Sequence, residues 1–321
     1  MPAISVIIPC YNVQTYVGKC LEQLRKQTFT DFEIILVDDC STDSTYALLT
    51  EYRLNFAQPI KILSNKKNSG PSISRKNGIA VSKAEYITFC DSDDWYDENF
   101  LKLMYEASNQ EKNDIVFCNY KSVFKNGRIV QHDIIGNLSS ESSKSEILVN
   151  SPDSLSAMMI RRCLLEDIEF PDIRNGEDMA IIPVIISKGE NFGFVKQSIY
   201  NYFQRSDSLS VKQTNILVEN LQKSYAYIEQ KLDLKWHSEC EFLGIRNLLY
   251  GAILNELKQG FHRSKVNMIL CSFEEDYSNW RTNRYLIQLP LHKRIFIFFV
   301  SHRIFSVAFC IARMHALYVK L

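Results

Sequence analysis

Three acidic side chains lie close together directly after a run of apolar residues. Asp91, Ser92, Asp93 and Asp94 follow residues 86–90, which have the composition of a buried strand. Carboxylates this close repel one another unless a cation or hydrogen-bond donors compensate their charge. Oxygen ligands of this kind suit Mg²⁺ or Mn²⁺. They also suit an acidic turn that caps the next helix, so the cluster alone leaves a metal site and a capped turn open.

The elements that would position this cluster are predicted by the pattern of the first 120 residues. Short apolar runs alternate there with helical patterns, which predicts an α/β fold with a mainly parallel sheet and crossover helices. In such sheets ligands bind beyond the carboxyl ends of the strands. Polar residues follow four of the runs, namely Tyr11 and Asn12, Asp38 and Asp39, residues 65–70, and residues 91–94.

Length and charge limit the classes of protein that the chain can belong to. Its 321 residues suffice for one large α/β domain and a smaller appendage. Lys and Arg together number 37, as do Asp and Glu, so the basic excess of a nucleic-acid-binding protein is absent. Nine scattered cysteines without a Cys-x-x-Cys pair indicate a reducing compartment. An apolar run that starts three residues after Met1 leaves no room for a signal peptide, which predicts a cytoplasmic protein.

Four motifs occur in the order found in family 2 glycosyltransferases, which have the GT-A fold. They are residues 5–12 with residues 35–43, residues 68–78, Asp91-Ser92-Asp93, and Gly176-Glu177-Asp178. The chain therefore resembles this family over about residues 3–210, and in particular its bacterial members that build surface polysaccharides. The resemblance implies sugar transfer from a nucleotide donor, with a UDP-sugar favoured, to a hydroxyl of a saccharide or of a lipid-linked saccharide.

The resemblance also implies a set of donor-binding residues. Asp39 would accept the ring N–H of uracil, and Arg75 and Arg205 would contact the diphosphate. Residues beside the base would be Pro9, Tyr11 and Asn12. From the residues alone, Asp39 could equally begin a helix, Tyr11 could belong to the core, and Arg75 could be a solvated helix residue.

Within the acidic cluster the resemblance distinguishes several roles. Asp93 would bind the divalent metal ion, and Asp91 would contact the ribose or the ion. Asp94 and Trp95 would lie near the donor sugar, although Trp95 could instead pack against the following helix.

A second acidic pair is the candidate for proton transfer. Inverting transfer needs a carboxylate that accepts the proton of the sugar hydroxyl, and Asp178 resembles the family's base. Glu177 would be its neighbour near the acceptor. Taken alone, the pair also suits an ordinary helix N-terminus.

The predicted organisation is a GT-A domain over residues 1–210 and a helical region over residues 211–321. The nucleotide-sugar half would span about residues 1–120 and the acceptor half about residues 120–210. Within the acceptor half we expect a helix over 154–165 and a strand over 200–203. The tail, residues 285–321, is basic and apolar but too interrupted for a transmembrane span. It would contact an anionic membrane at the cytoplasmic face or pack as a helical subdomain.

Two alternatives to a transferase remain at this stage. An apolar strand that ends in Asp-x-Asp is also the nucleophile motif of haloacid-dehalogenase phosphotransferases, although that family places the motif on its first strand. The third possibility is a non-catalytic protein that binds nucleotide sugars. The presence of Asp39, Asp93 and Asp178 together disfavours it.

Overall fold

The computed structural model describes residues 1–150, 152–205 and 215–318. The chain divides into two compact units, Met1–Ser208 and Leu209–Leu321. Each unit is described by itself below.

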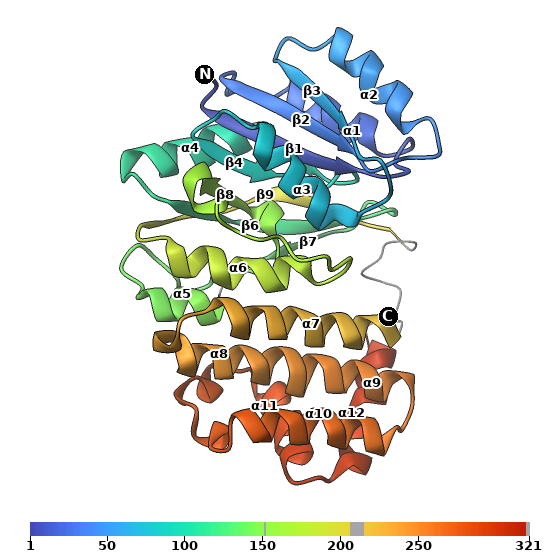
Figure 1. Ribbon diagram of the computed structural model, residues 1–321, viewed down its shortest axis with the longest axis vertical. Helices are drawn as coiled ribbons and strands as arrows, with labels where there is room; N and C mark the ends of the chain where they lie inside the picture. The colour runs from blue at the N-terminus through green and yellow to red at the C-terminus, as the bar shows by residue number, and fades with distance from the viewer. Residues whose placement is uncertain (151, 206–214, 319–321) are drawn as a thin grey trace. The chain divides into compact units, whose positions relative to one another are not determined.

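The first unit is built around one mixed sheet (Figure 1). Its strands are β1 (Ile4–Cys10), β2 (Phe32–Asp38), β3 (Ile60–Ser64), β4 (Tyr86–Phe89), β5 (Trp95–Tyr96), β6 (Ile115–Phe124), β7 (Ile129–His132), β8 (Met158–Arg161) and β9 (Phe192–Gln204). Its helices are α1 (Val17–Arg25), α2 (Thr45–Leu54), α3 (Gly70–Val81), α4 (Phe100–Gln110), α5 (Lys144–Asn150) and α6 (Glu177–Lys188), with short 3₁₀ turns η1 (Leu155–Ala157) and η2 (Arg162–Leu165).

The strand order in the described residues is β3-β2-β1-β4-β8-β6-β9-β5, with β7 paired to β6. The half formed by β3, β2, β1 and β4 is parallel throughout. Strand β8 then runs antiparallel between β4 and β6, whereas β6 and β9 are parallel to each other. The predicted α/β fold is confirmed, and the carboxyl ends of β1, β2 and β4 lie at one edge of the sheet, as a ligand site requires.

Both faces of the central strands are covered. Every residue of β2 is buried, which explains why its sequence is apolar without alternation. On β1, Ile4, Val6 and Ile8 belong to a core shared with α1 and α4. On the opposite face α3 packs closely, because a Cβ at Gly78 would lie 2.5 Å from Cγ2 of Ile7. Helix α3 is thereby held against β1.

Residues 120–210 depart from the sequence prediction in one segment. A helix was expected over residues 154–165, but the chain forms η1, strand β8 and η2 there. That prediction was wrong because β8 is buried between β4 and β6 and has no polar face, and an apolar run of this length does not distinguish a strand from a helix. The strand expected over 200–203 is confirmed within β9.

The second unit is helical. Its elements are α7 (Asn215–Lys231), η3 (Leu234–Trp236), α8 (His237–Gly244), the π-helix η4 (Ile245–Ala252), α9 (Ile253–Gln259), α10 (Arg263–Asp276), η5 (Trp280–Thr282), η6 (Arg284–Gln288), α11 (Leu291–Ser301) and α12 (Phe305–Tyr318). Within the described part of the chain, no helix combines the length and the apolar character needed to cross a bilayer.

The tail packs into this helical unit. Helix α11 buries Phe296, Ile297 and Val300, and α12 contacts α9 and α11. Several basic side chains in the tail or just before it are paired with acidic partners inside the unit. Arg281 and Arg303 both contact Glu274, and Arg284 contacts Glu239. Three large apolar side chains of α11 remain exposed, namely Leu291, Ile295 and Phe298.

Candidate active site

Asp94 attaches the acidic turn after β4 to strand β9. This residue is fully buried, and its carboxylate accepts hydrogen bonds from the hydroxyl of Tyr200 and from the backbone N–H of Phe203, the latter at 2.7 Å. Burial raises the pKa of Asp94 well above its ordinary value, and the nearby charges of Asp93 and Asp91 add to this effect. Asp94, expected near the sugar, therefore ties the turn to β9.

The other two carboxylates of the turn are accessible. The side chain of Asp91 is 38% exposed and that of Asp93 is 21% exposed. Oδ2 of Asp93 lies 3.2 Å from Nε of Arg205, whose guanidinium lies over the ring of Tyr16. The predicted metal ligand and a predicted diphosphate ligand thus contact each other. Ser206, Asp207 and Ser208, which complete the motif around Arg205, lie outside the described residues.

The donor set of this turn suits a hard cation only in part. Among the residues that the structure describes, no three His, Cys, Asp or Glu side chains are arranged to hold a metal ion by themselves. Asp91 and Asp93 offer two carboxylates, and Mg²⁺ is commonly bound by one or two carboxylates together with substrate phosphates and water. The turn therefore fits an ion that arrives with a diphosphate.

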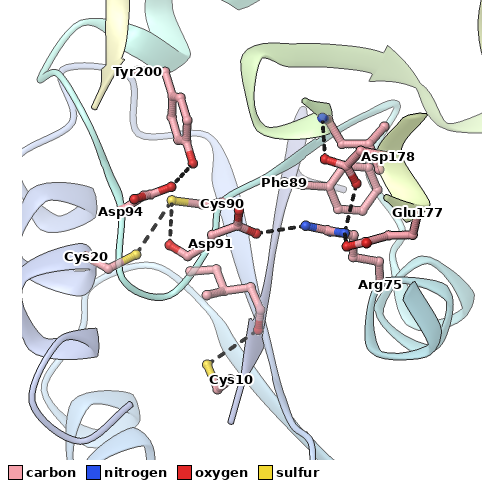
Figure 2. Close-up of polar contacts among 12 residues, drawn as sticks. Cys10, Cys20, Arg75, Phe89, Cys90, Asp91, Asp94, Glu177, Asp178 and Tyr200 are labelled. Atoms are coloured by element: carbon pink, nitrogen blue, oxygen red, sulfur yellow. Dashed lines mark hydrogen bonds and ion pairs between the residues drawn. The ribbon is translucent and has the colours of Figure 1, made fainter. Parts of the chain in front are cut away.

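Arg75 on α3 joins the acidic turn to the second acidic pair (Figure 2). Its NH2 lies 2.8 Å from Oδ1 of Asp91, and its NH1 lies 2.9 Å from Oε1 of Glu177 and 3.0 Å from Oδ1 of Asp178. The Arg75 side chain is only 3% exposed. Burial would lower the pKa of Arg75, but the three carboxylates outweigh it and raise that pKa above its ordinary value. The guanidinium is therefore permanently charged.

Asp178 lies in the first turn of α6, where Gly176 begins the helix with a φ of 99° that favours glycine. Its Oδ1 contacts Arg75, and its Oδ2 accepts the backbone N–H of Leu155 at 2.9 Å. Burial raises the pKa of Asp178 to about 7; Arg75 opposes this, whereas Glu177 and Asp91 add to it. A carboxyl group with this pKa can accept a proton near neutral pH.

Asp39 lies in a separate buried cluster at the end of β2. Its Oδ1 accepts hydrogen bonds from the side-chain amide of Asn65 at 2.7 Å and from the N–H of Ser69 at 2.9 Å. Its Oδ2 accepts the N–H of Gly70 at 2.7 Å. The carboxylate is 3% exposed and fixes the loop that leads into α3. Its predicted contact with uracil stays a prediction.

The comparisons with known proteins agree with one another. The sequence model described as glycosyl transferase family 2 matches residues 5–168. The minor teichoic acid biosynthesis protein GgaB of Bacillus subtilis is 30% identical over 65% of this chain and 24% of its own length. The poly(ribitol-phosphate) beta-N-acetylglucosaminyltransferase TarS of Staphylococcus aureus is 27% identical over 92% of this chain and 48% of its own.

The chain belongs to glycosyl transferase family 2. The chain spans about half of the length of TarS and about a quarter of the length of GgaB. Crystal structures of residues 1–349 of S. aureus TarS show the same fold. The complex with UDP matches this chain with a TM-score of 0.71 at 21% identity, and the match covers 98% of this chain and 91% of the TarS chain. A second structure is a complex with UDP-GlcNAc. The predicted GT-A fold and the predicted family are thereby confirmed.

The family's remaining predicted residues lie along the same edge of the sheet. Pro9 is partly buried at the end of β1, and the Tyr11 side chain is 44% exposed. Asn12, with a φ of 51°, accepts the backbone N–H of Thr42 at 2.8 Å and so joins the loops that follow β1 and β2. The exposed ring of Tyr11 leaves its predicted contact with the base available.

Trp95 packs on Lys19 of α1 and Phe203 of β9, and its predicted place near the donor sugar stays a prediction. The ammonium group of Lys19 lies 3.1 Å from the centre of the Trp95 ring, and Phe203 packs beside it. The following helix is contacted by Tyr96 instead, whose ring stacks on Phe100 at 3.6 Å. Trp95 therefore belongs to an aromatic cluster next to Arg205 and the acidic turn.

Sequence reasoning missed the groups that orient these side chains. The backbone N–H of Leu155, the hydroxyl of Tyr200 and the ammonium of Lys19 all come from segments without a motif. Of these three residues, only Tyr200 lies in a segment for which the sequence predicted a strand. A backbone N–H carries no side-chain signature, so the partner of Asp178 Oδ2 could not be found from residue types.

Proposed function

We propose that this chain catalyses metal-dependent, inverting transfer of a sugar from a UDP-sugar to a hydroxyl of a saccharide or lipid-linked saccharide. The observation that carries this proposal is the placement of Asp178, a buried carboxyl group with a pKa of about 7, one arginine away from the exposed Asp91 of the Asp-x-Asp turn. Such a pair of acidic sites suits a reaction that stabilises a leaving diphosphate and deprotonates an acceptor.

On the acceptor side Asp178 takes the proton. Both of its oxygens are already held, one by Arg75 and one by the N–H of Leu155, so its orientation is set before the acceptor arrives. Each oxygen keeps a lone pair for the acceptor hydroxyl. Glu177, also on Arg75, would border the acceptor.

On the donor side the partly exposed carboxylates of Asp91 and Asp93 would hold Mn²⁺ or Mg²⁺ together with the diphosphate. The ion would neutralise charge that develops on the leaving UDP. Asp39, Pro9, Tyr11 and Asn12 would border the uridine.

The preference for UDP rests on relatives. S. aureus TarS was crystallised with UDP and with UDP-GlcNAc. GgaB and TarS are named for teichoic acid synthesis and for poly(ribitol-phosphate) glycosylation, which supports a cell-wall or surface polysaccharide as the product. We propose that residues 1–120 form the donor half and residues 120–210 the acceptor half.

We also propose that the protein works in the cytoplasm, in peripheral contact with an anionic membrane. The exposed apolar side chains of α11, Leu291, Ile295 and Phe298, lie beside the exposed Arg294, which supports an interfacial contact. Pairing of Arg281, Arg284 and Arg303 with acidic partners reduces the charge available for it.

A direct test is UDP release from UDP-GlcNAc and from UDP-glucose with Mn²⁺, in wild type, Asp178→Asn and Asp93→Ala. We expect turnover in wild type, a loss of about 10²- to 10⁴-fold in Asp178→Asn, and a loss of metal dependence in Asp93→Ala. Asp31→Asn, an exposed residue outside the site, is the control. Activity that survives both site substitutions would refute the assignment.

The same assay separates the alternatives. Release of inorganic phosphate without UDP would indicate a phosphotransferase. Binding of UDP without release in every variant would indicate a non-catalytic binding protein. The anomeric configuration of a transferred sugar, read by NMR, tests inversion.

A further inference from the structure

Arg75 has the environment of a residue that organises other side chains. It projects from α3, is 3% exposed, and contacts three carboxylates within 3.0 Å (Figure 2). Its Nε is buried as well and has no hydrogen-bond partner among the described residues. NH1 donates to both Glu177 and Asp178, and NH2 donates to Asp91. Few donors remain for a phosphate.

The electrostatics of this cluster disfavour a bound diphosphate. One guanidinium faces three carboxylates, so when all are ionised the group carries an excess of negative charge. A diphosphate that approached Arg75 would meet this excess and would have to displace a buried ion pair. Removing one partner from such a pair is costly, because it leaves an uncompensated buried charge.

We propose that Arg75 is the positioning residue of Asp178, in place of the diphosphate ligand that the family resemblance implies. This inference rests on the proposed function of the site. Arg75 fixes Oδ1 of the base, while the N–H of Leu155 fixes Oδ2. Through its NH2 group Arg75 also donates a hydrogen bond to Asp91, so one side chain sets the spacing between the donor-side carboxylate and the base.

The helix that carries Arg75 is itself rigidly placed. Its N-terminal amides, from Ser69 and Gly70, bind the buried carboxylate of Asp39. Further along, Gly78 packs directly on Ile7 of β1. A guanidinium on such a helix arrives at a fixed position, and displacement of a base by about 1 Å can cost about 10²-fold in rate.

The first test compares Arg75→Lys with Arg205→Lys. Lysine keeps the charge but cannot donate to three carboxylates in the planar geometry of arginine. We expect Arg75→Lys to lower kcat for UDP release from UDP-GlcNAc by about 10- to 100-fold, while Kd for UDP with Mn²⁺, measured by calorimetry, changes less than about twofold. Arg205→Lys should instead weaken UDP binding. Weaker UDP binding in Arg75→Lys by a factor similar to that in Arg205→Lys would overturn the proposal.

A double-mutant cycle then asks whether Arg75 acts through Asp178. In Asp178→Asn the base is already lost, so adding Arg75→Lys should lower kcat little further. If the two losses multiply, Arg75 acts independently of the base and the proposal is wrong. Loss of turnover in Asp178→Asn but not in Arg75→Lys would refute this inference alone, whereas a wild type that never releases UDP would refute the proposed function.

A substitution at a second ion-paired arginine, Arg161, serves as the control for effects on folding. Arg161 pairs with Glu85 and Asp114 at the opposite end of β4, so Arg161→Lys reports the general effect of such a change on Tm without a loss of turnover. If Arg75→Lys does not fold, Glu177→Gln takes its place, since it removes one carboxylate from Arg75. There we expect a lower kcat with unchanged UDP affinity, and weakened UDP affinity would contradict the proposal.

Discussion

Asp178 shows how one residue can be tuned by opposing effects. Burial favours the neutral acid and Arg75 favours the carboxylate, and burial is the larger effect, which raises the pKa of Asp178 to about 7. A lower pKa would make the group a weaker base, and a much higher one would leave it protonated at neutral pH. Arg75 therefore keeps the pKa of the buried Asp178 low enough for the group to act as a base near neutral pH.

The pH dependence of turnover follows from this value. Because Asp178 must be ionised to accept a proton, we expect kcat for UDP release to rise with pH and to level off above about 7. Asp178→Asn should abolish this limb of the profile along with most of the rate. Steady-state kinetics from pH 5.5 to 8.5 would check it, and a wild-type profile that is flat across this range would contradict the prediction.

The ionisation of Asp178 should lower folding stability as pH rises, whereas it raises turnover. In the unfolded chain Asp178 ionises near its ordinary value of 3.8, whereas in the folded chain it keeps its proton up to about 7. Between these values folding stability falls as pH rises, since the unfolded state loses the proton first. Asn cannot ionise, so the Tm of Asp178→Asn relative to wild type should increase from pH 5 to pH 8. A constant difference in melting scans would argue against a raised pKa.

At this scale the sequence predicted which residues lie together better than what each of them contacts. Asp91, Asp93 and Asp178 were chosen through the family resemblance, because their patterns alone also suit a capped turn and an ordinary helix N-terminus. The partners of Arg75 could not be predicted, because Glu177 and Asp178 lie more than a hundred residues away along the chain and meet it only through the fold. Arg75 was accordingly expected to face a phosphate.

At the scale of elements, the attachment of the acidic turn to β9 is a separate requirement of the site. Tyr200→Phe would remove the hydroxyl that donates to the buried Asp94 and leave Phe203 N–H as the donor on its other oxygen. We expect a loss of about 1–3 kcal/mol in the free energy of unfolding. Urea denaturation would measure it, with Tyr46→Phe, whose side chain is 49% exposed, as control. Equal stability of the two variants would exclude the attachment as a stabilising contact.

The contact between α3 and β1 gives a second prediction at this scale. A methyl group at Gly78 would lie 2.5 Å from Cγ2 of Ile7, so Gly78→Ala must push α3 away from the sheet. We expect a loss of about 1–3 kcal/mol in unfolding free energy, together with lower turnover, because Arg75 moves with the helix. In Gly251→Ala the nearest atom would be 3.5 Å away, and we expect little change. Turnover and denaturation of both variants test this.

The parallel half of the sheet was predicted closely, because each strand there is a short apolar run followed by a helical pattern. The part of the sheet formed by residues 120–210 was not. Strand β8 is buried between two neighbours and lost the alternation that identifies strands, so its residues were assigned to a helix. Strand β9 was recognised only at its C-terminal end, because its register against β6 shifts between Cys118 and Tyr120.

At the scale of the whole molecule, the second unit is a packed helical body and its basic tail is part of it. The family match covers residues 5–168, so the helices after residue 209 lie outside that match. Glu239 and Glu274 form ion pairs with three arginines in the tail or just before it, Arg281, Arg284 and Arg303, a pairing that net charge could not predict. On α11 the tail exposes the apolar side chains of Leu291, Ile295 and Phe298, and on α12 it exposes Met314 and Leu317.

The exposed apolar side chains of α11 make the membrane proposal testable in the full chain. We expect wild type to sediment with phosphatidylglycerol vesicles more than with phosphatidylcholine vesicles, because Arg294 lies beside the apolar side chains and basic residues contribute about 1 kcal/mol each near an anionic surface. Burial of a Leu or Phe side chain is worth about 1.5–3 kcal/mol, so Leu291→Gln with Phe298→Gln should reduce binding more than tenfold.

Met268→Gln provides the control for this variant, since its side chain is 63% exposed but lies on α10. It should bind vesicles as wild type does, and all three proteins should share one Tm because none of the changed side chains is buried. If wild type ignores both kinds of vesicle, the tail serves only as part of the helical unit. Equal loss in the control and in the α11 variant would place the contact on another face.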